Sequence, residues 1–255
     1  MYVMTMDQRG STADVDRVPA LLAELEQLCP GARFERSVGD EVQGVPERPE
    51  DVVEIALHAL RSGRWYVGIG VGPVDLPLPA SPREGSGAAF VAARLAVERA
   101  KSAAPHVPLA VVVADGQRRP GAGAPAANTA ANPDDSPAGG PPGSRECSAA
   151  EAVLRLIGRL VQDRTAAQWK VVDALRGIRQ GHAAAHGTQK IAARQLGITE
   201  QSVSRALLRS GWQEEWAARP AAQMLLDLAH GLAVGPDNAG RPDNAARQTR
   251  NEGDR

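Results

Sequence analysis

The stretch QKIAARQLGITEQSVSRALL, from Gln189 to Leu208, decides how the C-terminal half of the chain is organised. Its small and apolar residues recur at helical spacing on both sides of Gly197, which predicts two short helices joined by a sharp bend. Glycine suits such a bend because a residue without a Cβ adopts the left-handed backbone at little cost. Ile198 is expected to fill the space under the turn, and Thr199 to cap the second helix. The residues expected to face inward are Ala192, Ala193, Leu196, Val203, Ala206 and Leu207.

The side chains that this arrangement leaves outward on the second helix form a short polar set near its N-terminal end. They are Thr199, Gln201, Ser202, Ser204 and Arg205. Side chains of these types contact base edges and phosphates in the major groove. The spacing of Ala193, Gly197 and Val203 resembles a helix-turn-helix DNA-binding unit, and the resemblance implies a double-stranded DNA partner. The alternative is an ordinary corner between two helices with a polar outer face.

The surrounding residues, 148–234, predict an all-α unit around this bend. Ser148-Ala149-Ala150-Glu151 and Thr165-Ala166-Ala167-Gln168 both have the pattern of a capping box. Trp212 to Leu232 is expected to form a last helix that places Trp216, Met224, Leu225 and Leu228 in the core. The unit leans basic, and beside the bend this favours phosphate contact over a merely solvated helix face. Lys190 and Arg209 therefore join the residues predicted to bind DNA.

Composition limits the classes of function that the chain can have. The 255 residues carry a formal net charge of -1, so the protein as a whole is not a polyelectrolyte binder. Any surface that binds nucleic acid must therefore be a local basic patch. The two cysteines, Cys29 and Cys147, do not make a disulfide framework, and Cys147 lies in a segment that is not expected to fold. We find neither a basic leader before an apolar segment nor an apolar run of bilayer length, so we expect a cytoplasmic protein.

The N-terminal half, residues 1–114, predicts a different architecture. Its expected elements alternate in the order β-α-β-β-α-β-α-β, which is typical of helices packed on a mainly antiparallel sheet with a ferredoxin-like core. The α+β class is therefore expected. The expected strands and helices are Tyr2–Met6, Ala13–Leu28, Phe34–Val38, Glu41–Val45, Asp51–Leu60, Trp65–Val71, Ala88–Lys101 and Leu109–Val113.

Two polar segments separate and end these units. Residues 115–147 and 235–255 contain almost no large apolar side chains, which predicts a disordered linker and a disordered tail. A signal has no evident route across such a linker unless the two units dock directly.

Two further patterns look like binding motifs. His182 and His186 have the spacing of a metal pair, but they stand between glycines without the glutamate of the metalloprotease pattern, so solvent-facing loop residues are favoured. Gly68-Ile69-Gly70-Val71-Gly72 lies inside a strand and leads into Pro73. A dinucleotide site needs a helix there, so close approach of backbone or ligand over a bare strand face is the better interpretation.

Asp7 ends the first strand and Asp40 lies at the tip of the hairpin. In the expected topology these strands are neighbours at the sheet centre, so the two carboxylates can meet at one point. Paired carboxylates suit Mg²⁺ or Mn²⁺, with a phosphate chain lying over the amides that open the first helix. Arg9, Gly10 and Ser11 are the residues of this turn predicted to bind a ligand. Plain turn-forming aspartates are the alternative.

Four stretches, MDQRGST, ERSVGDEVQG, YVGIGVGPV and GAAFVAARL, resemble in order the landmarks of the class III nucleotide cyclase and GGDEF palm domain. By this resemblance, Asp7 and Asp40 match the metal-binding acids, Arg94 matches the transition-state arginine, and Arg36 takes the slot of the base-reading lysine. The resemblance also implies a homodimer. Together with the C-terminal bend, the whole chain resembles the SatD-type family, which joins a diverged domain of this kind to a helix-turn-helix.

Phe90 departs from the cyclase pattern, because it stands where active cyclases keep an asparagine. A hydrophobic ring cannot donate the hydrogen bond that the reaction needs. We therefore expect a DNA-binding transcriptional regulator whose first domain senses a nucleotide or other phosphorylated ligand, and no enzyme activity. The alternatives are a divergent metal-dependent cyclase or phosphotransferase, and a first domain that only dimerises or docks.

Overall fold

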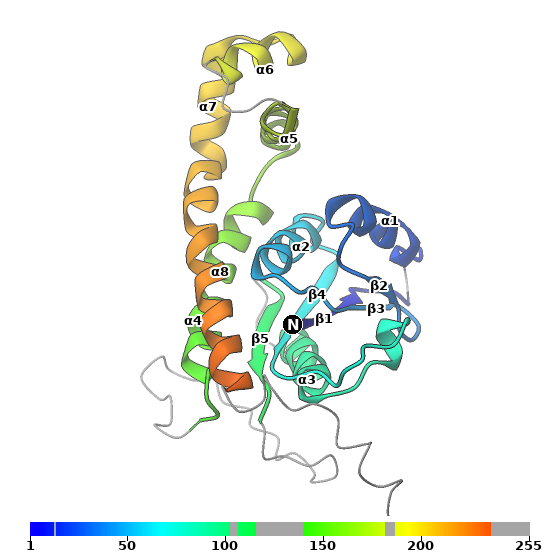
Figure 1. Ribbon diagram of the computed structural model, residues 1–255. Coiled ribbons are helices and arrows are strands. Elements are labelled where there is room, and N and C mark those ends of the chain that lie inside the picture. Colours follow the sequence, from blue (N-terminus) through cyan, green and yellow to red (C-terminus); the bar gives the residue numbers. More distant parts are fainter. Residues whose placement is uncertain (13, 103–106, 116–139, 182–186, 236–255) are drawn as a thin grey trace, which may run out of the picture.

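The computed structural model describes residues 1–12, 14–102, 107–115, 140–181 and 187–235. These residues form an α+β fold with a five-stranded sheet and eight α-helices (Figure 1). In chain order the elements are β1 (Tyr2–Gln8), α1 (Val18–Leu28), β2 (Phe34–Arg36), β3 (Glu41–Gly44), α2 (Pro49–Arg61), β4 (Trp65–Val71), the 3-10 turn η1 (Pro82–Glu84), α3 (Ala88–Ser102), β5 (Leu109–Val113), α4 (Ser144–Gln162), α5 (Ala166–Gly181), α6 (Thr188–Leu196), α7 (Glu200–Ser210) and α8 (Trp212–Val234).

The sheet has the strand order β2-β3-β1-β4-β5. Strand β1 lies at its centre and pairs antiparallel with both β3 and β4, while β4 and β5 are parallel. A central strand is covered on both faces, which explains why every residue from Tyr2 to Met6 is buried. The predicted element order and the mainly antiparallel sheet are confirmed, and the predicted strands Trp65–Val71 and Leu109–Val113 match β4 and β5.

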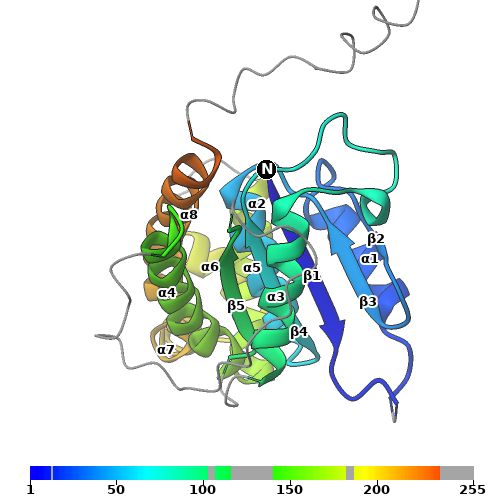
Figure 2. The same ribbon diagram turned by 90° about the horizontal axis from the view of Figure 1, so that it is seen from below.

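Helices cover both faces of the sheet, with α1 and α2 on one face and α3 on the other (Figures 1 and 2). Helix α3 lies directly on the glycines of β4. A Cβ added to Gly68 would stand 2.4 Å from the amide nitrogen of Val97, and one added to Gly70 would stand 2.2 Å from the carbonyl oxygen of Ala89. The bare strand face predicted from the sequence therefore accommodates backbone, and the neighbour is the protein's own helix.

We expect Gly70→Ala to lower the free energy of unfolding by about 1–3 kcal/mol, because α3 must move away from the added methyl group. Urea denaturation checks this value. Gly31→Ala is the matched control, since a Cβ there meets no atom within 4 Å. Equal stability of the two variants would contradict close packing of α3 on β4.

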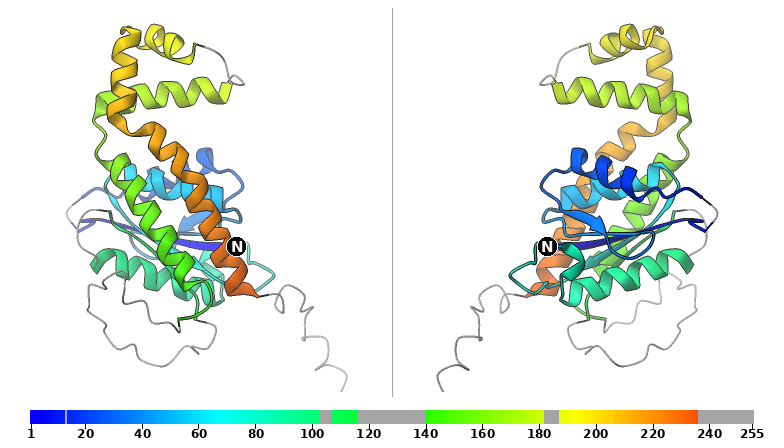
Figure 3. Two further views of the ribbon diagram at one scale, coloured as in Figure 1. Left: turned by 90° about the vertical axis from the view of Figure 1, so that its left-hand side faces the viewer. Right: turned by 90° about the vertical axis from the view of Figure 1, so that its right-hand side faces the viewer.

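Helices α4 and α8 pack against the sheet and share its main core (Figure 3). Cys147 and Leu154 of α4 and Leu226 of α8 belong to the same buried cluster as Met4 and Ile69. We call the sheet with α1–α3 the sheet unit. Helices α5, α6 and α7 form a second core with the start of α8, and we call this group the head. The segment expected to form one all-α unit therefore divides between two cores.

Helix α4 also covers the edge of the sheet. Strand β5 is an edge strand, and such strands leave backbone groups without a partner strand. The Glu151 carboxylate accepts a hydrogen bond from the Val111 amide at 2.8 Å, and Arg155 donates to the Leu109 carbonyl at 2.9 Å. Two charged side chains of α4 thus satisfy backbone groups of β5 and tie the helix to the sheet.

Two predicted helix starts are wrong. Helix α1 begins at Val18 and not at Ala13, because the carboxylate of Asp16 accepts from the Val18 amide at 3.0 Å and Pro19 follows in the first turn. Helix α4 begins at Ser144, so Ser148 is inside the helix and its hydroxyl donates to the Ser144 carbonyl. By contrast, the capping box at Thr165 is confirmed by reciprocal hydrogen bonds with Gln168 of 2.8 and 3.3 Å.

The early start of α4 changes the interpretation of Cys147. This residue was assigned to an unfolded linker, but it lies in the first turns of α4 and is buried. Both cysteines are free and buried, and burial raises the pKa of the Cys29 thiol to about 11 and that of Cys147 to about 12. His182, His186 and most of the predicted linker and tail lie outside the described residues. No described helix has the length and apolar character needed to cross a bilayer.

Candidate nucleic-acid interface

The bend at Gly197 has the geometry expected of a glycine-terminated helix. Gly197 has a φ of 66°, in the left-handed region, and a Cβ there would touch nothing within 4 Å. Its amide donates to the Arg194 carbonyl, and the Ile198 amide donates to the Ala193 carbonyl at 3.0 Å. These bonds satisfy carbonyls at the end of α6 that have no partner within the helix. The chain therefore turns sharply at a fixed residue.

Thr199 caps α7, as the sequence predicts. Its backbone is extended and its hydroxyl oxygen accepts a hydrogen bond from the Ser202 amide at 3.1 Å. The Ser202 hydroxyl lies 2.9 Å from the same oxygen. Both hydroxyls belong to the cap, so their first role is to fix where α7 begins.

The two helices are held by small and branched residues at their crossing. Ala192, Ala193, Val203 and Leu207 are buried, together with side chains of α5 and with Trp212. Ile198 does not fill the space under the turn as expected, because it is 41% exposed. Side chains of α5 and Trp212 complete this core, and they come from segments that the pattern of the bend does not contain.

The outward face of α7 is polar and basic. Gln201, Ser204, Arg205 and Arg209 are exposed, and Lys190 is exposed on α6. Gln201, Arg205 and Arg209 are four residues apart, so they lie along one side of the helix. The three cations of this surface form no ion pair with a described residue; they are Lys190, Arg205 and Arg209. Leu208 is 76% exposed beside them. The sequence pattern assigns Leu208 to neither face of the helix.

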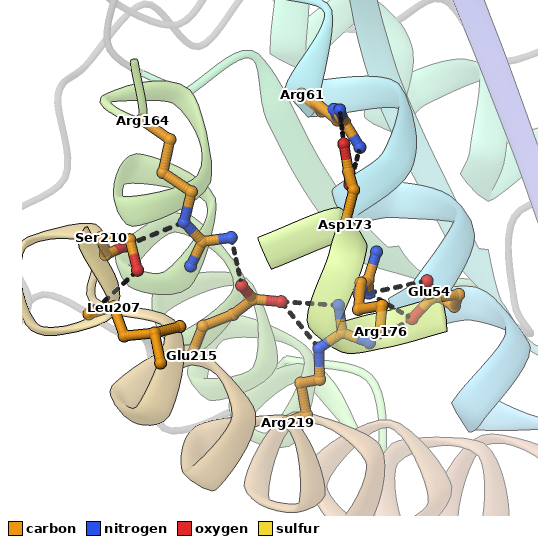
Figure 4. Close-up of polar contacts among 9 residues, drawn as sticks. All are labelled: Glu54, Arg61, Arg164, Asp173, Arg176, Leu207, Ser210, Glu215 and Arg219. Atoms are coloured by element: carbon orange, nitrogen blue, oxygen red, sulfur yellow. Dashed lines mark hydrogen bonds and ion pairs between the residues drawn. The ribbon is translucent and has the colours of Figure 1, made fainter. Parts of the chain in front are cut away.

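The head is joined to the sheet unit by a network of buried charges (Figure 4). Glu215 of α8 lies between two arginines: Arg164, whose Nη1 is 2.6 Å from its Oε2, and Arg219, whose Nη2 donates to its Oε1 at 2.6 Å. Arg219 also pairs with Glu54 of α2. Arg176 of α5 contacts the same Glu54 at 2.9 Å. The chain of contacts therefore runs from Arg164, just after α4, and from α8 through α2 to α5.

Further contacts hold the head on the sheet unit at this place, which we call the joint. Arg164 donates from Nε to the carbonyl of Ser210 at the end of α7, at 2.8 Å. Arg61 of α2 pairs with Asp173 of α5 at 2.7 Å and stacks over the Trp169 ring. Burial raises the pKa of the Glu54 carboxyl, but Arg219 and Arg176 outweigh that effect and the net shift is downward. The ionised form of Glu54 is thus the one that the joint stabilises.

We expect Glu215→Ala to lower the free energy of unfolding by about 3–5 kcal/mol, because it leaves Arg164 buried without its carboxylate. Arg48→Ala removes one partner of the exposed Arg48–Asp51 pair and should cost less than about 1 kcal/mol. Chemical denaturation of both variants gives the comparison. Equal losses would show that the buried network contributes no more than a surface pair.

The acids predicted from the sequence do come together at one end of the sheet. Asp7 pairs with Glu41 in the strand register, and the carboxylate of Asp40 is close enough to raise the pKa of Asp7 by repulsion. Burial is the largest cause of this upward shift, and Lys101 of α3 opposes it. The Lys101 ammonium lies 2.8 Å from Asp7 Oδ2. Arg94 attracts Glu41 and opposes the rise in the pKa of Glu41 that burial causes.

The residues predicted to bind a ligand are divided between the two faces of the sheet. Arg9 stacks over the Tyr66 ring and donates to the Gly63 carbonyl, on the α3 side with the acids. Arg36 lies opposite Val42 in the strand register, and Val42 faces α1. The Arg36 guanidinium forms an ion pair with Asp16 at 2.5 Å. Successive strand residues point to opposite faces, so these two arginines cannot act on one small ligand from the same side.

Two of the amides that lead into α1 are already occupied by carboxylates. Gly10 is exposed with a φ of 68°, and Ser11 precedes a loop that carries two aspartates. The carboxylates of Asp14 and Asp16 accept from the amides of Val15 and Val18, so the amides that lead into α1 already have anionic partners. A phosphate would meet negative charge there and no helix start.

The acid cluster does not fit a resident Mg²⁺ or Mn²⁺ as it stands. The Asp7 carboxylate is already neutralised by the Lys101 ammonium, at the distance of a direct ion pair. Within the described residues, no three His, Cys, Asp or Glu side chains are grouped so that they could hold a metal ion. A divalent cation would have to displace Lys101, and metal binding at Asp7 and Asp40 stays a prediction.

We expect Lys101→Met to increase the stabilisation of the protein by Mn²⁺, because it removes the competing ammonium from Asp7. Thermal unfolding with and without Mn²⁺ measures the change in Tm. The double variant Lys101→Met with Asp7→Asn should lose the gain. A larger Mn²⁺ effect in the unaltered protein than in Lys101→Met would show that Lys101 does not compete.

A cavity of about 460 Å³ opens elsewhere, between α1, β2 and η1. Its described lining includes Glu26, Arg33 and Glu35 but none of the residues predicted to bind a ligand. Glu35 accepts hydrogen bonds from the Ser81 hydroxyl and the Arg83 amide, so its charge serves to hold the 73–87 loop. The acid cluster and this cavity are therefore separate features.

Comparison with known proteins adds no relative. No protein-family model matches the chain, and no curated protein or solved structure matches it at a significant level.

Proposed function

We propose that the chain is a DNA-binding transcriptional regulator and that α6 and α7 form a helix-turn-helix. The observation that carries this proposal is the exposed, unpaired polar and basic face of α7 beyond a rigid glycine bend. The head also lies at the end of the molecule farthest from the sheet, with α6 and α7 clear of the sheet unit (Figures 1 and 3). Among the described residues, a duplex can therefore approach α7 without meeting the sheet unit.

In this proposal α7 enters the major groove by its N-terminal half. Gln201, Ser204 and Arg205 are placed to meet base edges, since amide and guanidinium groups make paired hydrogen bonds to adenine and guanine. Lys190 and Arg209 supply the phosphate contacts that set orientation and affinity. Thr199 and Ser202, which the sequence also assigned to DNA, are engaged in the cap and support the position of α7.

We also propose that the sheet unit is a ferredoxin-like, cyclase-related domain without the cyclase reaction, as the resemblance to the SatD-type family implies. The strand order β2-β3-β1-β4 with antiparallel pairing supports this. Phe90 is buried against Val3 and Ala93, in the position where the reaction would need a polar group. The domain would then serve as a nucleotide sensor or a dimerisation unit, with Arg9 and Arg94 on the side of the acid cluster.

Sequencing of genomic DNA fragments retained by the full chain tests the DNA proposal. The retained fragments should share a sequence, and affinity for it should fall steeply with salt because phosphate contacts release counterions. Absence of any retained sequence, or affinity that does not respond to salt, would overturn the proposal.

A single substitution tests the role of α7. We expect Arg205→Ala to weaken binding to the retained sequence about tenfold, which corresponds to roughly 1.4 kcal/mol. Arg83→Ala removes the same charge from an exposed position on η1 and should leave affinity unchanged. Titration of labelled duplex by fluorescence anisotropy gives both values. Equal effects would indicate a general charge effect and no contact by α7.

A further inference from the structure

On its outer face, helix α8 carries few of the charges that usually cover a surface helix. Its inner face buries Trp212, Glu215, Arg219, Ala222, Leu226 and Ala229. Its outer face carries an apolar residue at every fourth position from Trp216 to Leu232, which we call the α8 stripe. The stripe consists of Trp216, Pro220, Met224, Leu228 and Leu232, and all five are exposed.

The exposure of the stripe is large for side chains of these types. Met224 is 58% exposed, and Leu228 and Leu232 are about half exposed. The five side chains together present apolar area on the order of 400 Å², and contiguous patches of that size usually mark an interaction site. The left panel of Figure 3 shows α8 and α4 along one side of the molecule, with no described element in front of them.

We propose that the α8 stripe is the contact between two copies of this chain. A standard interface buries about 800 Å² on each partner, with somewhat more than half of it apolar, and the stripe matches that apolar share. In a twofold dimer each residue near the axis meets its own copy, so a self-complementary face has to be uncharged there. Met224 and Leu228 satisfy this condition.

The charges around the stripe favour a second copy over other partners. The charged residues exposed on α8 are Glu214 and Asp227, and both are acidic. Nucleic acid and an anionic bilayer would require unpaired lysine or arginine beside the apolar residues. The two arginines that lie over the Trp216 ring, Arg176 and Arg219, are paired with Glu54 and Glu215. Asp227 immediately precedes Leu228 of the stripe, and an exposed carboxylate beside an apolar patch is typical of the rim of an interface.

The spacing of the stripe also sets the geometry of the contact. A row of residues four apart is inclined to the helix axis, and two such rows interdigitate when the helices cross at about 50°. The two copies of α8 would therefore cross near Met224 instead of running in parallel along their whole length. The interface does not include α6 or α7, so it leaves the outer face of each α7 open and does not depend on DNA binding.

Mass measurement on the full chain tests this interface. Sedimentation equilibrium should give twice the 26.8 kDa of one chain for the unaltered protein, and one chain for Leu228→Glu at the same concentration. Leu95→Glu is the matched control, because Leu95 on α3 is also 50% exposed and also lies on a helix surface. Circular dichroism confirms that both variants are folded.

The interface is overturned if the unaltered protein is monomeric up to its solubility limit. It is also overturned if Leu228→Glu remains a dimer, or if Leu95→Glu is the variant that dissociates. Cross-linking gives a second readout, since Met224→Cys should form a disulfide with its copy under mild oxidation. The native cysteines are buried, so the unaltered protein should not cross-link.

Discussion

The Glu215 carboxylate is the point on which the two halves of the molecule depend. It is almost completely buried, and it holds the guanidinium group of Arg164, in the segment between α4 and α5, and that of Arg219, one turn further along α8. Through Arg219 it reaches Glu54 of the sheet unit, and through Arg164 it reaches the carbonyl that ends α7. Buried charges are costly unless each has its partner, so this arrangement holds α2, α4, α7 and α8 in one relative position. The direction in which α7 points follows from that position.

This joint answers a question that the sequence leaves open, namely how the sheet unit can influence the head. The polar segment between β5 and α4 is not needed as a route, because α2 touches α5 directly through Arg61–Asp173 and Glu54–Arg176. Any change that moves α2 changes the partners of α5 and α8 at the same time. Coupling through a contiguous set of ion pairs needs no direct contact between the sheet and α7.

Much of the fold can be predicted from local patterns. The element order, the antiparallel sheet, the strand β4 with its bare glycine face, the bend at Gly197 and the cap at Thr199 all follow from periodicity and turn chemistry. These features depend on residues close together in the chain. The failures involve distant partners: Ile198 is exposed because α5 and Trp212 complete the core of the head, and Cys147 is buried because α4 packs on the sheet.

The candidate site shows the same contrast between features set by neighbouring residues and features set by distant ones. Register brings Asp7 and Asp40 together as expected, but the ammonium that occupies the space beside Asp7 comes from Lys101, far along the chain at the end of α3. Strand alternation separates Arg36 from Arg9, and a motif match does not record which face a residue takes. On α8 the expected inner face is wrong: Trp216, Met224 and Leu228 were expected in the core and are exposed. The charged residues Glu215 and Arg219 occupy inner positions instead, because they have partners on other elements that a hydrophobic pattern does not record.

The division of the C-terminal helices between two cores has a consequence for how such a protein can evolve. Helix α8 begins in the core of the head and ends against the sheet, where the amine of Met1 lies 2.7 Å from His230. A recombination event that replaced everything after the polar segment would also remove two helices from the core of the sheet unit. A different head therefore has to be inserted between α4 and α8, and it also has to pack against the first turn of α8, because Trp212 belongs to the core of the head.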